Sequence, residues 1–395
     1  MKKSIEDISV NGKRVIVRCD FNVPMDEENN ITEDMRIVSA IPTIKYLIDH
    51  QSKVILMSHL GRPKGNVEPR FSLAPVAKRL SELLGKEVYF SDDDTVVGDK
   101  TRKAVEGMKA GDVILLQNLR FRKEETKNEP SFSKELASLA DIYVNDAFGS
   151  SHRVHCSTFG IADYIPAVSG FLLKKELDIL ESALENPERP LTVILGGAKV
   201  GDKISAIENL INKADTIIIG GGMAYTFLNA KGFNTGQSLV EEDKIDFARS
   251  LLQQAKEKGV KVLLPIDVCV TKEFKNDTEF KCIKVDKIQD DEMGMDMGEE
   301  TIKLFTDEIA RSRTIIWNGP MGVFEMPNFA KGTREIARAL TENAGVTIIG
   351  GGDSGAAVQQ MGFAEKMTHI STGGGATLEF LKGKDLPGVA ILEDM

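Results

Sequence analysis

Short apolar runs rich in β-branched residues alternate along the chain with longer amphipathic stretches. Such runs are typical of strands, and apolar residues spaced three and four apart indicate helices. Most runs are apolar throughout, as in parallel strands covered by helices on both faces. The pattern predicts strands at 14–19, 54–58, 113–117, 142–145, 192–195, 216–219, 262–265, 314–317, 347–349 and 369–371. It predicts helices at 37–49, 74–84, 133–139 and 171–185.

This alternation predicts an α/β protein with two doubly wound lobes, each a mostly parallel sheet covered by helices on both faces. The segment 171–185 is the predicted join, a long helix whose leucines recur at helical spacing before Pro187 and Pro190 end it. A chain of 395 residues suits two or three domains. A boundary here gives two lobes of ordinary domain size.

Composition narrows the class of protein. Sixty acidic residues against fifty basic ones give a net charge of −10, which disfavours nucleic acid and anionic membranes as partners. No apolar run is long enough for a membrane span, and the first residues lack a signal-peptide pattern. The four cysteines show no C-x-x-C spacing, so we expect no disulfide framework and a reducing cytoplasm.

Arginine and glycine are distributed unevenly along the chain. Ten of the sixteen arginines lie in residues 1–153, whereas only ten of the 35 glycines lie in residues 1–170. Ligands of doubly wound sheets bind beyond the carboxyl ends of the strands, so the residues that follow each strand matter most. The two halves are therefore expected to carry different sites.

In the first half, four predicted strands are each followed by Arg, His, Asp or Asn, and these residues converge on one sheet edge. Guanidinium groups match carboxylate and phosphate geometry, so this edge is predicted to bind a small polyanion. His152 and His155 form H-x-x-H, but no further ligand completes a metal site. A second anion contact or a structural hydrogen bond is the better interpretation of this pair.

In the second half, five predicted strands end in glycine turns, where backbone N–H groups can approach a phosphate or a purine ring. Lys199 and Lys203 are four residues apart and are expected to share one helix face. The G-x-G-x-x-G pattern at 350–355 would suit a dinucleotide, but Asp353 inside it would repel a pyrophosphate. A carboxylate there suits Mg²⁺ better, so a Mg-nucleotide is favoured over NAD.

The motifs at these turns resemble those of phosphoglycerate kinase, in that family's order and over essentially the whole chain. They are RCDFNVP at 18–24, SHLGRP at 58–63, NLRF at 118–121, NDAFGSSHRVH at 145–155, GGAKVGDKI at 196–204, GGGMAYTF at 220–227, WNGPMGVFE at 317–325, GGGDS at 350–354 and STGGGATLE at 371–379.

The resemblance implies reversible phosphoryl transfer between 1,3-bisphosphoglycerate and Mg-ADP, giving 3-phosphoglycerate and Mg-ATP, by direct in-line transfer with domain closure. It implies a phosphoglycerate lobe of residues 1–170 plus about 381–395, a hinge helix at 171–185 and a nucleotide lobe at 186–380. It further implies a cytoplasmic monomer that uses Mg²⁺ with ADP or ATP.

The same resemblance implies residue roles. The phosphoglycerate ligands would be Asp20, Asn22, Arg36, His59, Arg62, Arg120 and Arg153. The nucleotide ligands would be Gly197, Ala198, Lys203, Gly221, Leu239, Gly294, Met295, Asn318, Val323, Glu325, Gly351, Gly352, Asp353 and Ser354, with Asp353 facing Mg²⁺. The catalytic set would be Arg36, Lys199, Lys203, Gly373 and Gly374.

Three positions depart from the family's usual residues: Gln117, Glu292 and Met295. They raise a question about local pairing and the edge of the adenine pocket. Two other functions are weighed. A two-domain NAD-dependent dehydrogenase would use the 350–355 glycines but leaves the arginine edge unused. A two-lobed binding protein that closes on an anion is usually exported.

Overall fold

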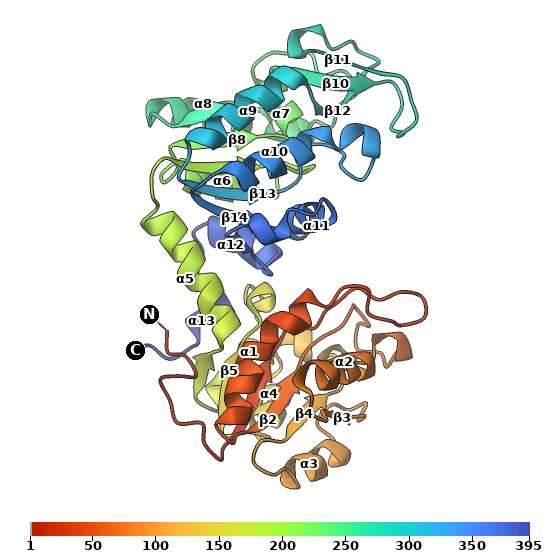
Figure 1. Ribbon diagram of the computed structural model, residues 1–395, viewed down its shortest axis with the longest axis vertical. Helices are drawn as coiled ribbons and strands as arrows, with labels where there is room; N and C mark the ends of the chain where they lie inside the picture. The colour runs from red at the N-terminus through yellow and green to blue at the C-terminus, as the bar shows by residue number, and fades with distance from the viewer. Residues whose placement is uncertain (1) are drawn as a thin grey trace. The chain divides into compact units, whose positions relative to one another are not determined.

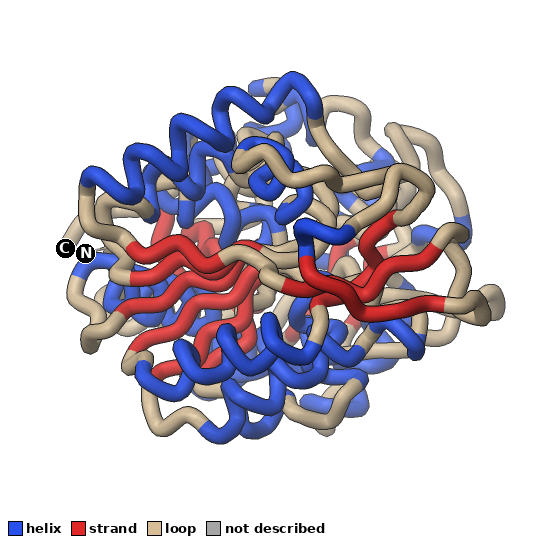
Figure 2. The backbone as a smooth tube through the Cα atoms, turned by 90° about the horizontal axis from the view of Figure 1, so that it is seen from above, coloured by secondary structure: helices blue, strands red, loops and turns tan. Residues whose placement is uncertain are grey.

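The computed structural model describes residues 2–395, which form two compact units. The first unit extends to Asp178 and is completed by Asp385–Met395, and the second covers Ile179–Lys384. The division falls inside helix α5 (Phe171–Glu185). The two chain ends lie side by side (Figures 1 and 2), where Lys2 Nζ lies 2.9 Å from a carboxylate oxygen of Asp394.

The first unit is built on a six-stranded, fully parallel sheet of order β3-β4-β2-β1-β5-β6. Its strands are β1 (Arg14–Arg18), β2 (Lys53–Met57), β3 (Tyr89–Ser91), β4 (Val113–Leu116), β5 (Ile142–Asn145) and β6 (Ala167–Ser169). Its helices are α1 (Met35–Asp49), α2 (Ala74–Leu84), α3 (Asp99–Glu106), α4 (Pro130–Ala137) and α13 (Pro387–Ala390). The chain winds outward from β1 in both directions, so the sheet is doubly wound.

The second unit repeats this plan with a parallel sheet of order β15-β14-β13-β7-β8-β9. Its strands are β7 (Leu191–Leu195), β8 (Thr216–Ile219), β9 (Lys261–Leu263), β13 (Thr314–Asn318), β14 (Val346–Gly350) and β15 (His369–Ile370). Its helices are α6 (Ile204–Leu210), α7 (Ala224–Ala230), α8 (Ile245–Glu257), α9 (Glu299–Arg311), α10 (Lys331–Glu342), α11 (Gly352–Gln360) and α12 (Gly375–Leu381).

A second, three-stranded sheet in this unit is antiparallel, with the order β11-β10-β12. Its strands are β10 (Asp267–Thr271), β11 (Phe280–Lys284) and β12 (Met293–Met297). The sequence pattern did not predict it, because β11 is mostly exposed and β12 carries glycine and aspartate. Neither strand therefore has the apolar run that marks a buried strand.

Burial explains why the apolar runs form the sheets. Strands β4, β5 and β7 are buried at every position, and Figure 2 shows strands as a layer between helices. Helix α10 turns Ile336, Ala337 and Leu340 inward, a helical spacing that buries one face. The predicted α/β class with two doubly wound sheets is confirmed. None of the helices among residues 2–395 is long and apolar enough to cross a membrane.

The expectation that the cysteines are unpaired is wrong for two of them. Cys269 on β10 and Cys282 on β11 are directly opposite in the antiparallel ladder and form a disulfide. The spacing gave no signal because the bridge joins two strands that were not predicted. Cys19 and Cys156 are buried free thiols, as expected of cysteines used in packing.

Candidate active site

In the first unit, the loops at the carboxyl ends of β1, β2, β4 and β5 bring cationic and polar side chains together, as the sequence predicts. The site begins with Arg18, the last residue of β1, which is 1% exposed although charged. One guanidinium nitrogen lies 3.0 Å from His59 Nδ1, and Nε donates to Ser157 Oγ at 2.9 Å. Because a buried charge is costly unless paired, this residue needs a counter-charge nearby.

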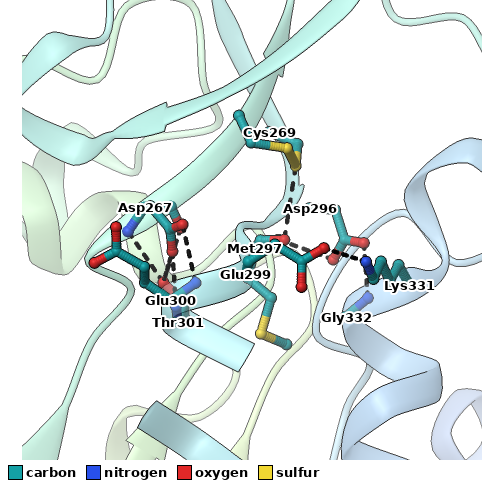
Figure 3. The surroundings of a disulfide bond; sticks show 10 residues. Asp267, Cys269, Asp296, Met297, Glu299, Glu300, Thr301, Lys331 and Gly332 are labelled. Atoms are coloured by element: carbon teal, nitrogen blue, oxygen red, sulfur yellow. Dashed lines mark hydrogen bonds and ion pairs between the residues drawn. A yellow bond between two sulfur atoms is a disulfide. The ribbon is translucent and has the colours of Figure 1, made fainter. Parts of the chain in front are cut away.

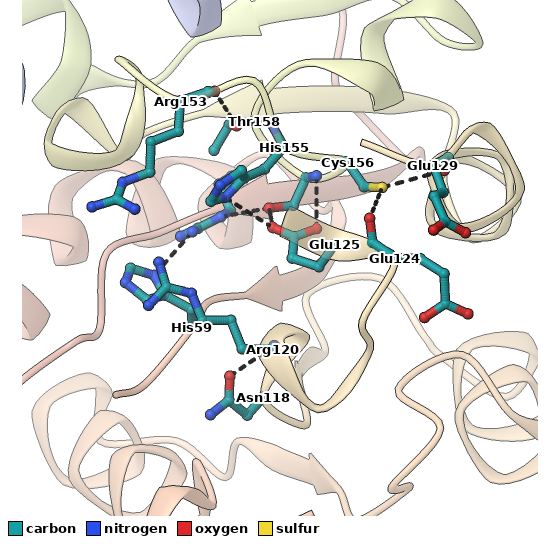
Figure 4. A network of polar contacts seen from close by, with 12 residues as sticks. His59, Asn118, Arg120, Glu124, Glu125, Glu129, Arg153, His155, Cys156 and Thr158 are labelled. Carbon is teal, nitrogen blue, oxygen red and sulfur yellow. Dashed lines mark hydrogen bonds and ion pairs between the residues drawn. The ribbon is translucent and has the colours of Figure 1, made fainter. Parts of the chain in front are cut away.

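Glu125 supplies that negative charge. It is fully buried, and its carboxylate accepts hydrogen bonds from Ser157 Oγ at 2.6 Å and from Ser157 N at 3.1 Å. Its Oε1 lies 3.9 Å from His155 Nδ1, so it also faces the histidine (Figure 4). Burial raises the pKa of Glu125, and the guanidinium of Arg18 opposes that shift. Sequence reasoning missed Glu125, because a glutamate in a charged loop looks like surface.

The histidines of this site are neutral near pH 7. Burial, reinforced by the charge of Arg18, holds the pKa of His59 well below its ordinary value of 6.5. Burial and the same guanidinium lower the pKa of His155 to about 3, and this outweighs the attraction of Glu125 at 3.9 Å. Burial also lowers the pKa of Arg120 to about 10, with Arg153 adding to the effect. The site thus holds excess positive charge that an anion would relieve.

A cavity of about 520 Å³ opens beside this network. Of the predicted phosphoglycerate ligands, Arg62, Arg120 and Arg153 line it, together with His155. Other residues lining the cavity are Lys64, Gly65, Arg122, Lys123, Thr126 and Lys127. Sequence reasoning missed these lysines, because nothing in their spacing separates them from surface lysines. No carboxylate lines the cavity, which is notable in a chain of net charge −10.

The other predicted ligands of this unit form a connected set. Arg36, in the first turn of α1, donates to Asn22 O at 2.9 Å and lies 3.4 Å from Asp20 Oδ1. Asn22 Oδ1 accepts from Gly61 N at 2.8 Å, and Gly61 O accepts from Arg120 at 2.7 Å. Hydrogen bonds therefore link the loops that follow β1, β2 and β4. All seven predicted residues therefore lie in this set, in the cavity lining or, for His59, against Arg18.

Gln117, a departure from the family pattern, retains the local pairing. Its Oε1 accepts from Leu73 N at 3.1 Å and from Asn118 N at 2.9 Å, and its amide donates to Ser72 Oγ at 3.2 Å. Asn118 in turn accepts from Arg120 N at 3.0 Å. A neutral amide therefore holds the turn that presents Arg120.

In the second unit, the predicted glycine turns meet at the carboxyl ends of β7, β8 and β13. Gly197 and Gly221 have φ of 96° and 63°, in the left-handed region that favours glycine. Side chains would not fit here: a Cβ on Gly221 would lie 2.7 Å from Gly197 N and Pro320 O. Trp317, buried on β13, donates through Nε1 to Gly319 O at 2.7 Å and anchors the third turn.

These turns border a cavity of about 530 Å³. Nine of the predicted nucleotide ligands line it: Gly197, Ala198, Gly221, Leu239, Gly294, Met295, Val323, Glu325 and Asp353. Further lining residues include Tyr225 of α7, Val268 of β10, Phe274 and residues of β12. Sequence reasoning missed Val268, Phe274 and the β12 residues because the antiparallel sheet was not predicted. An apolar cavity of this size with a few polar groups is typical of a small-molecule site.

Five predicted nucleotide ligands do not line this cavity: Lys203, Asn318, Gly351, Gly352 and Ser354. Lys203 is 9% exposed and donates to Asn318 Oδ1 at 2.6 Å. Burial lowers its pKa, while Asp202 and Asp353 oppose the shift. The Ser354 hydroxyl donates to Gly350 O at 2.9 Å and accepts from Gly319 N at 2.7 Å, so it ties two turns together.

The expectation that Lys199 and Lys203 share a helix face is wrong. Helix α6 begins at Ile204, so both lysines lie in the preceding turn, and Lys199 is exposed whereas Lys203 is buried. The glycines and the aspartate at 196–202 favour a turn over helix. Gly373 and Gly374 precede α12, and Gly374 has a φ of 49°.

The donors present fit Mg²⁺ bound together with phosphates. Asp353 lies in the first turn of α11 and faces the cavity that Glu325 also lines. No cluster of three or more His, Cys, Asp or Glu suited to a metal occurs among residues 2–395. Mg²⁺ needs only one or two protein carboxylates when substrate phosphates complete its shell. A single aspartate in the first turn of α11 meets that requirement.

Two α/β units, one with a cationic cavity and one with a glycine-lined cavity, have the organisation of a phosphotransferase. The family model for phosphoglycerate kinase matches residues 5–384. A phosphoglycerate kinase of Clostridium kluyveri is 60% identical over 395 residues, covering 100% of this chain and 99% of the relative. One from Clostridium tetani is 59% identical, covering 100% and 98%. The chain belongs to the phosphoglycerate kinase family.

Solved structures agree. The structure of phosphoglycerate kinase from Coxiella burnetii has a TM-score of 0.89 at 41% identity, covering 99% of this chain and 98% of that one. The crystal structure of the enzyme from Pyrococcus horikoshii OT3 has a TM-score of 0.82 at 34% identity, with the same coverage. The predicted activity is confirmed: this is a kinase of glycolysis that transfers a phosphoryl group reversibly between 1,3-bisphosphoglycerate and ADP. Nothing supports the dehydrogenase alternative.

Proposed function

We propose that the first unit binds 3-phosphoglycerate and the second binds Mg-ADP or Mg-ATP, and that the enzyme acts as a cytoplasmic monomer. The observation that supports this proposal is that the two units contain cavities with different linings. One cavity is lined by three of the predicted arginines and no carboxylate, and the other by glycine turns and apolar side chains. The first suits a small polyanion and the second a purine nucleotide.

In the first unit, Arg62, Arg120 and Arg153 are the proposed ligands of the substrate phosphate, because they line one cavity and present forked donors. Asp20, Asn22, Arg36 and His59 complete the proposed substrate set. Because the guanidinium of Arg18 can only donate, Nδ1 of the neutral His59 accepts from it, and the Nε2–H is left to donate to a substrate oxygen. Arg36 is the proposed partner of the carboxylate that accepts the phosphoryl group.

In the second unit, the cavity residues other than Asp353 are the proposed adenine and ribose contacts, with Glu325 the acceptor for the ribose hydroxyls. Lys203 is the proposed partner of the transferring phosphoryl, with Asn318 holding its ammonium group in place at 2.6 Å. Lys199, exposed in the same turn, together with Gly373 and Gly374, is proposed to meet the phosphates. Mg²⁺ held by Asp353 would neutralise phosphate charge.

The chemistry explains why no general base is needed. The acceptor in the ATP-consuming direction is a carboxylate that is already ionised near pH 7. Catalysis then depends on alignment and on cations around the phosphoryl group, as in other phosphoryl transfers. Because the two substrates are held by different units, we propose that the units close for direct in-line transfer. Closure would also exclude water from the acyl phosphate.

A coupled assay tests the proposal. The enzyme is given 3-phosphoglycerate and Mg-ATP, and formation of 1,3-bisphosphoglycerate is followed through NADH consumption by a coupling dehydrogenase. Turnover that requires all three components supports the proposal, and no turnover overturns it. Omitting the coupling enzyme is the control for direct NADH oxidation. Light scattering of the eluting protein tests the monomer.

A further inference from the structure

The disulfide lies in the sheet that forms one wall of the nucleotide cavity. Cys269 is 8% exposed, whereas Cys282 sits on β11, a strand exposed along nearly its whole length. The two are cross-strand partners, so the bridge links β11 covalently to β10. Figure 3 shows Cys269 beside Met297 of β12, and the sulfur lies 3.7 Å from Met297 O.

Strand β10 connects the bridge to the cavity. It pairs on one side with β11 and on the other with β12, and its residue Val268 lines the cavity. The β10–β12 register shifts between Cys269 and Val270, so that Met295 is the extra residue of a bulge. A bulge redirects the side chain it carries. Cys269, one of the two bridged cysteines, is therefore one of the two β10 residues between which the register with β12 shifts.

Few other contacts hold β11 in place. Its ladder with β10 is supplemented by the ion pairs Lys281–Glu292 and Lys284–Glu300 and by an edge-to-face contact of Phe280 with Phe329. Lys281 is more than half exposed, and such ion pairs contribute little. The hairpin that joins β10 to β11 also carries Phe274, which is 65% exposed and lines the cavity. The bridge is a covalent cross-link between β11 and β10, the strand whose Val268 lines the cavity, and it adds to the hydrogen bonds that Asn328 donates to Asn276 in the hairpin.

We propose that the Cys269–Cys282 pair is a reversible redox modification site that sets the affinity of the adjacent cavity for adenine nucleotide. The oxidised form orders the hairpin and preorganises the wall formed by Val268, Phe274 and Met295. Preorganisation strengthens binding by reducing the ordering needed on association. Reduction frees β11 and weakens nucleotide binding. The proposal rests on the assignment of this cavity to the nucleotide.

The chemistry needs a dithiol, or two monothiols, as reductant. A thiolate attacks the exposed sulfur of Cys282, and the disulfide bond breaks with its electron pair leaving on Cys269, which takes up a proton. The second thiol of the reductant then releases Cys282 as a thiol, and the reductant becomes a disulfide. The new thiol of Cys269 can donate to Met297 O, a hydrogen bond that the disulfide cannot make. Reduction therefore also changes a contact to β12.

The test compares oxidised and reduced enzyme. Enzyme purified without reductant should show two reactive thiols on denaturation, and four after treatment with dithiothreitol. Titration calorimetry should give a Kd for ADP that is about 5-fold or more weaker after reduction, while the Kd for 3-phosphoglycerate stays unchanged. Four thiols before reduction, or equal ADP affinities in both states, would overturn the proposal.

Two variants provide controls. Cys282→Ser changes an exposed residue and should bind ADP like reduced enzyme, with or without dithiothreitol. Cys156→Ser removes a thiol from the other unit and should retain the full redox response. If Cys282→Ser binds ADP like oxidised enzyme, the bridge does not set affinity and the proposal fails. If oxidised enzyme binds no ADP at all, it is the assignment of the cavity to the nucleotide that fails.

Discussion

Gly294 offers a test of the nucleotide cavity whose size follows from the structure. A Cβ at this position of β12 would lie 1.7 Å from Tyr225 Oη and 2.1 Å from Tyr225 Cζ, where real contacts rarely fall below 3.0 Å. Gly294→Ala therefore forces the buried ring or the strand to move by more than about 1 Å. Overpacking of this kind costs about 1–3 kcal/mol. If that strain is expressed in the bound state, ADP affinity falls about 5- to 150-fold.

Titration calorimetry with ADP and with 3-phosphoglycerate measures the effect. We expect weaker ADP binding and unchanged 3-phosphoglycerate binding, since Gly294 and the arginines belong to different units. Gly107→Ala is the matched control, because its Cβ has ordinary room, with nearest atoms at 3.5 Å. Adding Tyr225→Leu to Gly294→Ala makes space and should restore part of the affinity. Wild-type ADP affinity in Gly294→Ala would refute the assignment of this wall to the nucleotide.

Three further predictions concern single residues. Arg36→Ala should lower kcat by roughly 10²–10³, as loss of a preorganised transition-state donor does, and near-wild-type kcat in steady-state kinetics would remove its catalytic role. Asp353→Asn should weaken Mg-ADP binding in calorimetry and leave 3-phosphoglycerate binding unchanged; the opposite pattern would contradict its role. The pKa of His155 is about 3 in the folded protein against 6.5 when free, so the unfolded chain binds more protons below pH 6.5. Stability is then lost as the pH falls through 6.5, by about 2 kcal/mol at pH 5 for this group, and His155→Gln should remove that loss in urea unfolding. An NMR titration of His155 near pH 6.5 would contradict the buried, neutral state.

Much of the fold could be predicted because the central strands are continuously apolar. All ten predicted strands coincide with strands of the two parallel sheets. Strands β3 and β6 and the whole antiparallel sheet were not predicted. Strands β3 and β6 are only three residues long, β11 is mostly exposed, and the apolar run of β10 is limited to 268–270, so none of them carries a long apolar signature. The disulfide was not predicted for the same reason, because Cys269 and Cys282 lie opposite each other only once β10 and β11 pair.

The site was predictable where a strand end fixed the position of a residue. Arg62, Arg120 and Arg153 follow different strands and line one cavity, as their places in the sequence predict. Glu125 was not predictable, because its burial depends on the loop after β5 folding over it. The prediction that Lys199 and Lys203 share a helix face was wrong for a local reason. A spacing of four implies a shared face only inside a helix, and α6 begins at Ile204, after both lysines.

The two cavities of this acidic chain differ in the groups that they offer to an anionic ligand. The first unit gathers guanidinium groups around Arg18 and places the buried carboxylate of Glu125 among them. It keeps both histidines of the site neutral, so no further positive charge is added. Burial is the main cause of the lowered pKa of Arg120, and the positive charge of Arg153 adds to it. An arriving polyanion supplies the missing negative charge, so the site gains more from its ligand than from a permanent internal partner. The second unit needs no such excess, because its glycine turns offer backbone N–H groups whose partial charges require no counter-ion.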